Sequence, residues 1–216
     1  MLPPTTRCLE TVRVKSPRLL GSLWLASPRN GELQERFDMR GVAQAWKAAE
    51  KVLKDHGVRR TPINVARIAS KHATLVTRAL EDDISGALIP LGEKAWAILV
   101  NSQHHPNRQR FTIAHELGHL LLHGYTTPHA DKQFRLRDAR SSEGSVLEEI
   151  QANQFAAELL MPRAMILKAI QRQGLQHSPA NEEMEEKHFD ALVSKLAKDF
   201  RVSRQAMTIR LSSLVA

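Results

Sequence analysis

Two histidines and a glutamate stand at a spacing that suits metal chemistry, in the run His115-Glu116-Leu117-Gly118-His119. On a helix, positions four apart project from the same face about one turn apart, so both imidazoles can reach one ion. Tetrahedral zinc accepts such a pair of nitrogen ligands. Glu116 is turned partly off this axis and can take a proton from a water that the metal activates. The motif therefore predicts zinc-dependent attack of water on a scissile carbonyl.

The surroundings of the motif favour this interpretation over a chance match in a histidine-rich chain. The same helix carries the apolar side chains Phe111, Ile113, Ala114, Leu117, Leu120, Leu121 and Leu122. Without a metal, three polar groups would be buried among them at about 1–3 kcal/mol for each group left unpaired. A bound ion removes that cost, so we expect His115 and His119 to be metal ligands and Glu116 to be the general base.

A zinc hydrolase needs a third protein ligand and an open fourth position. His123 continues the same helix face, but ligands at 115, 119 and 123 would span about 12 Å, which is too far for one metal. We expect His123 to make a supporting or helix-end hydrogen bond instead. Glu148 and Glu149 begin a later helix and are equal candidates, although either could simply favour its first turn. Glu158, further along, reads as a surface carboxylate.

Apolar spacing and turn residues predict the elements that must position these side chains. Helices are expected over residues 42–56, 61–71, 107–123, 146–160, 163–173, 182–200 and 203–214. Thr61 is the expected N-cap of the second helix, and Gly124 ends the third before a long loop. Strands are expected over 73–80, 84–90 and 94–100, the last two as a hairpin. Residues 124–145 are polar and are expected to form the loop.

Length and composition set the remaining bounds. The 216 residues suit one domain or one domain with a small appendage, and the single Cys8 excludes a disulfide framework and a Cys-rich zinc module. A reduced cytoplasm is the default compartment, and no stretch approaches the ~18 apolar residues of a membrane helix. The net charge of +8 is a weak indication of an acidic or DNA-bound partner.

The first part of the chain differs from the rest. Prolines punctuate residues 1–38, and apolar periodicity is poor there. We predict a disordered extension over 1–38, a catalytic domain over 39–175 and a helical segment over 176–216. Met39 opens the well-patterned region and is an alternative start position.

Several blocks resemble the ImmA/IrrE metallo-endopeptidases. The blocks run from Arg110 to His123 and from Glu149 to Pro162, with support from Ile84-Ser85-Gly86, Asn101, Leu196 to Ser203, Ala206 and Arg210-Leu211. The match covers roughly residues 42–214. It implies a zincin-like α+β fold with a small sheet of about three strands. It also implies that the third ligand is Glu149, four residues before Asn153, and that the substrate is a helix-turn-helix repressor cut to relieve repression.

A rival hypothesis is a non-proteolytic regulator that binds DNA or sequesters a DNA-bound repressor. Residues 200–206 look like the turn and start of a recognition helix, with Arg204, Gln205 and Arg210 available to DNA. The alternative is a helical pair packed on the catalytic domain through Val202, Ala206, Ile209 and Leu214. We favour packing or protein docking, because one such unit without a clear dimer interface reads DNA poorly.

Details of the site stay open at this stage. A purely structural zinc is a third alternative, and two imidazoles with a carboxylate would also suit Mn²⁺. An extended substrate could add beside the strand that ends near Val100. The loop could close over the site through Arg135, Arg137 and Arg140. Donors for the developing oxyanion could come from His104, His105, His123 or Tyr125.

Overall fold

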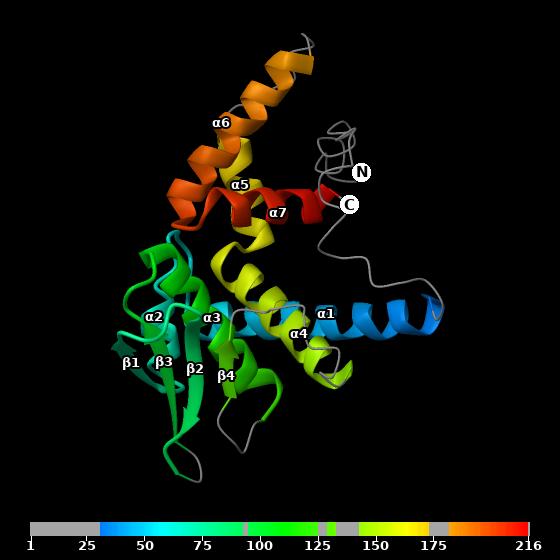
Figure 1. Cartoon of the computed structure of the whole chain (residues 1–216). Helices are drawn as coiled ribbons and strands as arrows, with labels where there is room; N and C mark the ends of the chain where they lie inside the picture. Colours follow the sequence, from blue (N-terminus) through cyan, green and yellow to red (C-terminus); the bar gives the residue numbers. More distant parts are fainter. Residues whose placement is uncertain (1–30, 93–94, 125–128, 133–142, 173–181, 216) are drawn as a thin grey trace.

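The structure is a computed structural model that describes residues 31–92, 95–124, 129–132, 143–172 and 182–215. It mixes helices with one small sheet, which confirms the predicted α+β class (Figure 1). The elements in chain order are α1 (Gly31–Asp55), α2 (Val65–Ala69), β1 (Thr74–Arg78), β2 (Ile84–Pro90), β3 (Trp96–Asn101), α3 (Pro106–Leu122), β4 (His129–Lys132), α4 (Glu143–Leu160), α5 (Arg163–Arg172), α6 (Glu182–Phe200) and α7 (Arg204–Val215).

The sheet has the strand order β1-β3-β2-β4. β2 and β3 form the predicted antiparallel hairpin, in which Gly86 faces Val100, and β1 runs parallel to β3. The fourth strand, β4, lies antiparallel to β2 in a segment that we expected to be loop. Its four residues, His-Ala-Asp-Lys, lack the alternation that marks a strand. The pairing edge that β2 offers, rather than local propensity, explains why this segment is extended.

The position of β3 corrects one expectation about substrate binding. β3 ends at Asn101 and lies inside the sheet, with β1 on one side and β2 on the other. Both of its hydrogen-bonding edges are therefore occupied, and an extended peptide has no place to pair there. Within the described strands, the sheet edges are β1 and β4.

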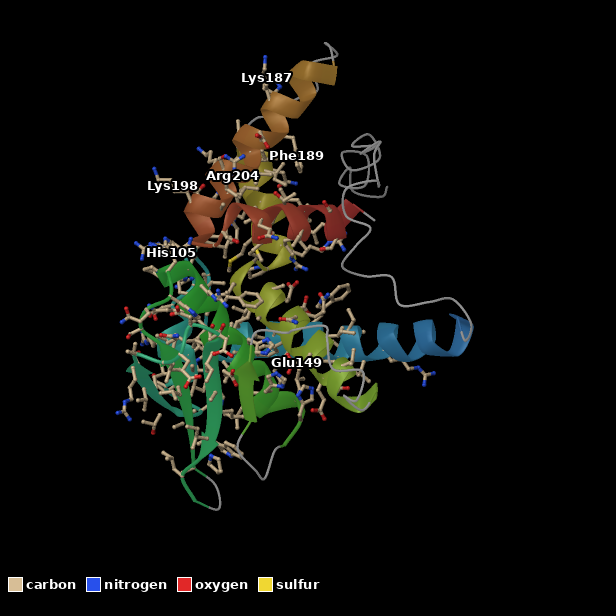
Figure 2. The ribbon with its side chains drawn as sticks, in the orientation of Figure 1. His105, Glu149, Lys187, Phe189, Lys198 and Arg204 are labelled. Carbon is tan, nitrogen blue, oxygen red and sulfur yellow. The ribbon has the colours of Figure 1, made fainter. Side chains whose placement is uncertain are left out.

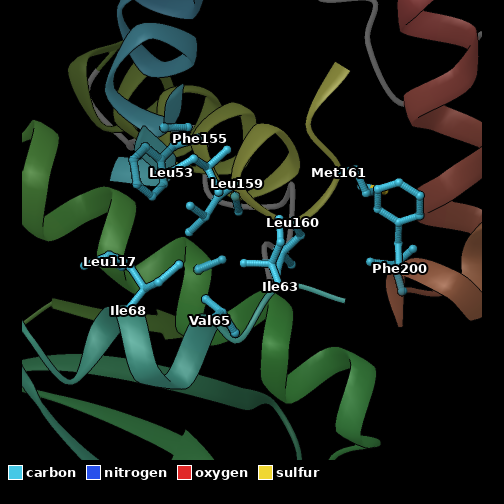
Figure 3. Close-up of a cluster of buried hydrophobic side chains, with 14 of the residues drawn as sticks. Leu53, Ile63, Val65, Ile68, Leu117, Phe155, Leu159, Leu160, Met161 and Phe200 are labelled. Atoms are coloured by element: carbon cyan, nitrogen blue, oxygen red, sulfur yellow. The ribbon is translucent and has the colours of Figure 1, made fainter. Parts of the chain in front are cut away.

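Helices cover the sheet in successive layers. α3 packs across β2 and β3, α4 packs on α3, and α1 packs along α4 (Figure 1). Figure 3 shows the core between them, where Leu117 of α3 and Phe155 and Leu159 of α4 meet Leu53 of α1. Burial of these apolar side chains at about 25 cal/mol per Å² holds the two helices that carry the predicted ligands.

Two helix starts differ from the sequence expectations. α1 begins at Gly31 rather than at Val42, so residues 31–38 of the expected extension belong to a helix, whereas residues 1–30 lie outside the described structure. Polar helix-forming residues there gave no apolar stripe to read. α2 begins at Val65 rather than after Thr61, because the Asn64 side chain accepts a hydrogen bond from the Arg67 amide at 3.0 Å and caps the helix.

The turn between α6 and α7 is tied to the start of α3. Asn107 Nδ2 donates to the Val202 carbonyl at 3.0 Å, and Arg110 Nε donates to the Arg201 carbonyl at 3.3 Å. Arg110 also donates to the Ile63 carbonyl at 2.8 Å. Phe200, next to this turn, is fully buried in the common core (Figure 3). The last two helices therefore pack on the domain that carries the HExxH helix.

A buried ion pair joins α7 to the end of α4. Arg210 pairs with Glu158 and also donates to the Met161 carbonyl at 3.1 Å, while Glu158 accepts from the Arg163 amide at 3.1 Å. Both side chains are about 95% shielded, with residue exposures of 4% and 5%. Two expectations are corrected: Glu158 is not a surface carboxylate, and Arg210 is not available to DNA. Burial raises the pKa of the Glu158 carboxyl, and the Arg210 charge works in the opposite direction.

The packing face of α7 also differs from the one read from sequence. Val202, Met207 and Leu211 are buried, whereas Ile209 is 50% exposed. Ala206 and Leu214 are only partly buried against the core. Of the four residues expected to pack on the domain, Val202, Ala206 and Leu214 do so and only Ile209 does not. Apolar spacing could not reveal that Arg210 occupies a core-facing position. None of the described helices combines the length and apolarity that crossing a bilayer requires.

Candidate metal centre

Three side chains from the two helices α3 and α4 converge at one point. His115 Nε2 and His119 Nε2 lie 3.0 Å apart. Glu149 reaches them from α4, with Oε2 at 3.3 Å from His115 Nε2 and Oε1 at 3.1 Å from His119 Nε2. The two histidines are buried, whereas the side chain of Glu149, labelled on α4 in Figure 2, is 21% exposed.

Hydrogen bonds on the far side of each ring orient the histidines. His115 Nδ1 lies 3.1 Å from Asn153 Oδ1, and because an amide oxygen accepts, this contact suits the His115 tautomer that carries its proton on Nδ1. His119 Nδ1 lies 3.1 Å from His123 Nδ1, and His123 Nε2 lies 2.8 Å from Gln151 Oε1. Both histidine rings therefore have a partner at Nδ1 and direct Nε2 toward Glu149.

These positions fit a tetrahedral metal ion. Two atoms bound at about 2.0–2.1 Å to one zinc in tetrahedral geometry lie about 3.3 Å apart, close to the three separations observed here. Two Nε2 lone pairs and a carboxylate brought this close repel one another, and a cation or a proton between them removes that repulsion. A set of three ligands, two imidazoles and one carboxylate, also leaves a fourth coordination position on the metal for water. The side chains of His115, His119 and Glu149 could therefore hold one metal ion together.

Glu116 points from the same helix toward the sheet. Its residue is fully buried, and a Cβ added to Gly86 of β2 would lie 3.5 Å from Glu116 Oε1. That Cβ would also lie 2.4 Å from Thr112 Cγ2 and 2.7 Å from the Leu99 carbonyl. Glycine at position 86 is therefore what lets β2 approach α3 and enclose the Glu116 carboxylate. The carboxylate is held beside the cluster rather than in it.

Glycine at position 118 has a matching role on the other side of α3. A Cβ there would lie 3.0 Å from Phe155 Cδ1 and 3.2 Å from Ala152 Cα. Ala152 is less than one helical turn from Glu149, so the distance between the helices at Gly118 sets how far Glu149 reaches. The residue between Leu117 and His119 in the motif therefore controls the approach of the third candidate ligand.

Other residues considered at the sequence level lie elsewhere. Glu148 is half-buried and does not belong to the cluster. His105 caps α3, with Nδ1 accepting from the Asn107 amide at 3.2 Å, and stands ten residues or about 15 Å from His115 (Figure 2). His104 Nε2 lies 3.4 Å from the Asp82 carbonyl, in the same region. Neither histidine can serve an oxyanion at the cluster.

His123 lies at the site, but its ring nitrogens face His119 and Gln151 rather than the open side of the cluster. The structure thus supports its expected supporting contact and not an oxyanion role. Tyr125, Arg135, Arg137 and Arg140 lie outside the described residues.

Sequence reasoning missed two polar partners, Gln151 and Asn153. Asn153 follows Glu149 by one helical turn, which places both on one face of α4. Once Glu149 was a candidate ligand, this spacing could have indicated that Asn153 also lies at the site. Gln151 had no such signal, because its partner His123 belongs to a different helix.

Comparison with known proteins places these features in a family. Residues 54–212 match the sequence model of the Peptidase_M78 family, described as the IrrE N-terminal-like domain. The chain is 39% identical over 103 residues to the radiation response metalloprotease IrrE of Deinococcus deserti, covering 43% of this chain and 34% of that protein. It is 41% identical over 80 residues to the protein of the same name from Deinococcus radiodurans, covering 36% and 23%. The chain thus spans about a third or less of these relatives.

A solved structure has a similar fold. A Mycobacterium tuberculosis transcriptional regulator aligns with a TM-score of 0.53 and 19% identity, over 84% of this chain and 50% of that one. At this identity the likeness concerns the fold alone.

Proposed function

Because the chain belongs to the Peptidase_M78 family of IrrE N-terminal-like domains, we propose that it is a zinc-dependent endopeptidase. The observation that carries the proposal is the convergence of His115, His119 and Glu149 beside the buried Glu116. Three protein ligands with a fourth position open favour a catalytic over a closed structural site. Zinc is proposed over manganese because two imidazole ligands and near-tetrahedral spacing suit it better.

Each residue has a distinct role in the proposed mechanism. His115, His119 and Glu149 would hold the ion, which supplies a Lewis acid that acidifies water and polarises a carbonyl. Glu116 accepts the proton of the attacking water and then delivers it to the leaving amine. The close approach of Gly86 in β2 encloses the Glu116 carboxylate and holds it in place for this role.

The sheet suggests where an extended substrate would lie. β4 pairs with β2 on one side and is the edge strand nearest in sequence to the end of α3. An extended peptide could pair with the outer edge of β4, with main-chain hydrogen bonds providing affinity. The edge of β4 thus replaces β3, the strand that ends near Val100, as the proposed place for substrate pairing, because both edges of β3 are occupied.

We further propose that the substrate is a helix-turn-helix transcriptional repressor in the cytoplasm, whose cleavage relieves repression. The resemblance of the paired HExxH and α4 blocks to ImmA/IrrE endopeptidases supports this substrate class. The Deinococcus relatives are named radiation response metalloproteases, which connects such proteins with a regulated response. The net charge of +8 suits a partner with acidic surface.

The test is co-expression of the chain with the helix-turn-helix repressors encoded near its gene, comparing wild type with Glu116→Gln on a gel. The proposal expects one repressor to be cut in a metal-dependent way by wild type only, while Glu116→Gln still binds zinc. Cleavage by Glu116→Gln at the wild-type rate would overturn the mechanism. Tight binding of an intact repressor would favour the rival, sequestering function.

DNA binding by the C-terminal helices is the other form of the rival. The burial of Arg210 removes one of its three proposed contacts, and Arg204 lies 3.2 Å from Asp190 in an exposed ion pair. Salt-sensitive binding of the purified protein to duplex DNA would nevertheless support it.

A further inference from the structure

The His119 ring is held by a chain of polar contacts that crosses from α3 to α4. We propose that His123 and Gln151 are positioning residues that fix His119 in the protonation state and orientation needed to ligate the metal through Nε2. The proposal rests on the zinc site proposed above and assigns two further residues to it. Neither residue touches the metal or the substrate, so both act through His119.

The polar contacts lead from His119 through His123 to Gln151. His119 Nδ1 lies 3.1 Å from His123 Nδ1, and His123 Nε2 lies 2.8 Å from Gln151 Oε1. His119 and His123 are four residues apart on α3, and their ring centroids are 5.2 Å apart. These contacts link the buried His119 of α3 to Gln151 of α4.

Proton positions follow from the last acceptor. The Gln151 oxygen can only accept, so His123 Nε2 must carry a proton. In the tautomer with its proton on Nε2, His123 has a lone pair on Nδ1, and it accepts the proton of His119 Nδ1. With its proton on Nδ1, His119 presents the lone pair of Nε2 toward His115 and Glu149. A single amide oxygen thus sets the state of a ring that it does not touch.

Gln151 is itself held in place at its other end. A Cβ added to Gly41 of α1 would lie 2.5 Å from Gln151 Nε2, so the amide fits against α1 only because position 41 is glycine. With Nε2 against α1, the amide directs Oε1 toward His123. α1 therefore supports the site through Gln151, although it contributes no ligand.

The two ligand histidines are held differently. His115 relies on Asn153, which is an exposed residue in direct contact with its ring. His119 is fully buried and relies on the part-buried pair His123 and Gln151. Water can replace the Asn153 oxygen but has less access to the His119 side. Loss of the contacts through His123 and Gln151 should therefore affect metal binding more than loss of Asn153.

Two variants of equal shape test the role of His123. Asparagine keeps an acceptor oxygen near the position of Nδ1, whereas leucine has the same size and no acceptor. His123→Leu should weaken zinc binding at least tenfold, since loss of a partner behind a metal-bound histidine costs about 10–100-fold in affinity. His123→Asn should stay near wild type. The zinc affinity of Gln151→Leu should lie between those of the two His123 variants. His123 Nδ1 remains as an acceptor for His119, but no amide oxygen then fixes which ring nitrogen of His123 carries the proton.

The measurement is the zinc dissociation constant of the full chain by competition with a chromophoric chelator, with the visible spectrum of the Co²⁺-loaded protein. Gln154→Leu is the matched control on α4, because Gln154 accepts from Trp46 Nε1 at 3.4 Å and not from the site. The melting temperature of each metal-free variant shows whether the fold is intact. A purely structural role would lower that temperature without changing zinc affinity in the folded range.

The outcomes separate this inference from the proposed function. Weak zinc binding by His123→Leu, together with near-normal zinc binding by His123→Asn, supports the positioning role of His123. Equal affinities of wild type and His123→Leu, or equal losses in both His123 variants, would overturn it while the zinc site stands. If wild type binds zinc no better than His119→Ala, the proposed metal site fails, and the inference fails with it.

Discussion

Gly118 of α3 and Phe155 of α4 are in such close contact that a Cβ at position 118 would lie 3.0 Å from Phe155 Cδ1. Ala152 backbone atoms lie almost as near. The HExxH motif thus contains the point at which its helix meets the helix of the third proposed ligand. The spacing of α3 and α4 at this point decides whether Glu149 reaches His115 and His119.

We expect Gly118→Val to destabilise the protein by about 1–3 kcal/mol, because added methyl groups overfill a packed contact. Zinc affinity should fall as well, since α4 must move away from α3. Chemical denaturation and chelator competition measure the two effects. Adding Phe155→Leu creates space, so the double variant should lose less than the sum of the single changes. Strict additivity would show that the contact does not control the helix spacing.

The ion pair between Arg210 and Glu158 gives a second prediction. Arg210→Met should cost about 3–5 kcal/mol, because Glu158 would be left buried without its charged partner. Changing both residues, as Arg210→Met with Glu158→Leu, should recover most of that loss. Urea denaturation of the four proteins in the cycle measures the coupling. A coupling near zero would mean that the pair is not buried in solution.

Removal of metal should change stability as well as activity. Chelation should abolish cleavage, and zinc should restore it. At a free zinc concentration of about 100 times the dissociation constant, the bound form should gain about 2.7 kcal/mol of stability. The zinc-dependent rise in melting temperature should persist in Glu116→Gln and vanish in His119→Ala. A rise of the same size in His119→Ala would place the metal elsewhere.

A fourth prediction concerns pH and a pair of histidines away from the metal site. His56 Nε2 and His72 Nε2 lie 3.3 Å apart, and burial followed by the His56 charge lowers the pKa of His72 from its usual value near 6.5. The unfolded chain therefore binds more protons than the folded one just below pH 6.5, and the free energy of unfolding falls as pH drops through this window.

The variant His72→Gln should lose less stability between pH 7.5 and pH 5.5 than wild type. Thermal melts of the two metal-free proteins at both pH values measure the difference, because the remaining histidines titrate in both. An identical fall in the two proteins would show that His72 does not contribute. A larger fall in His72→Gln would reverse the sign and refute the prediction.

The amino-acid sequence alone determined the chemistry-bearing helix and much of the framework. His115 and His119 could be identified as candidate ligands because their spacing is a local property of one helix. The hairpin and most helix ends followed from local turn and cap residues. The α+β class and the family resemblance required no tertiary information. Glu149 needed that resemblance, since local pattern treated Glu148 and Glu149 alike.

Only the tertiary structure decided which distant residues meet. Gly86 and Gly118 look like ordinary glycines until β2 and α4 lie against α3. Glu158 and Arg210 read as surface residues, because pairing between α4 and α7 cannot be inferred from the spacing within either helix. The same holds for Gln151 and His123, and for β4, whose polar sequence becomes a strand by pairing with β2. Local patterns encode periodicity and capping, whereas these contacts depend on how separate elements pack.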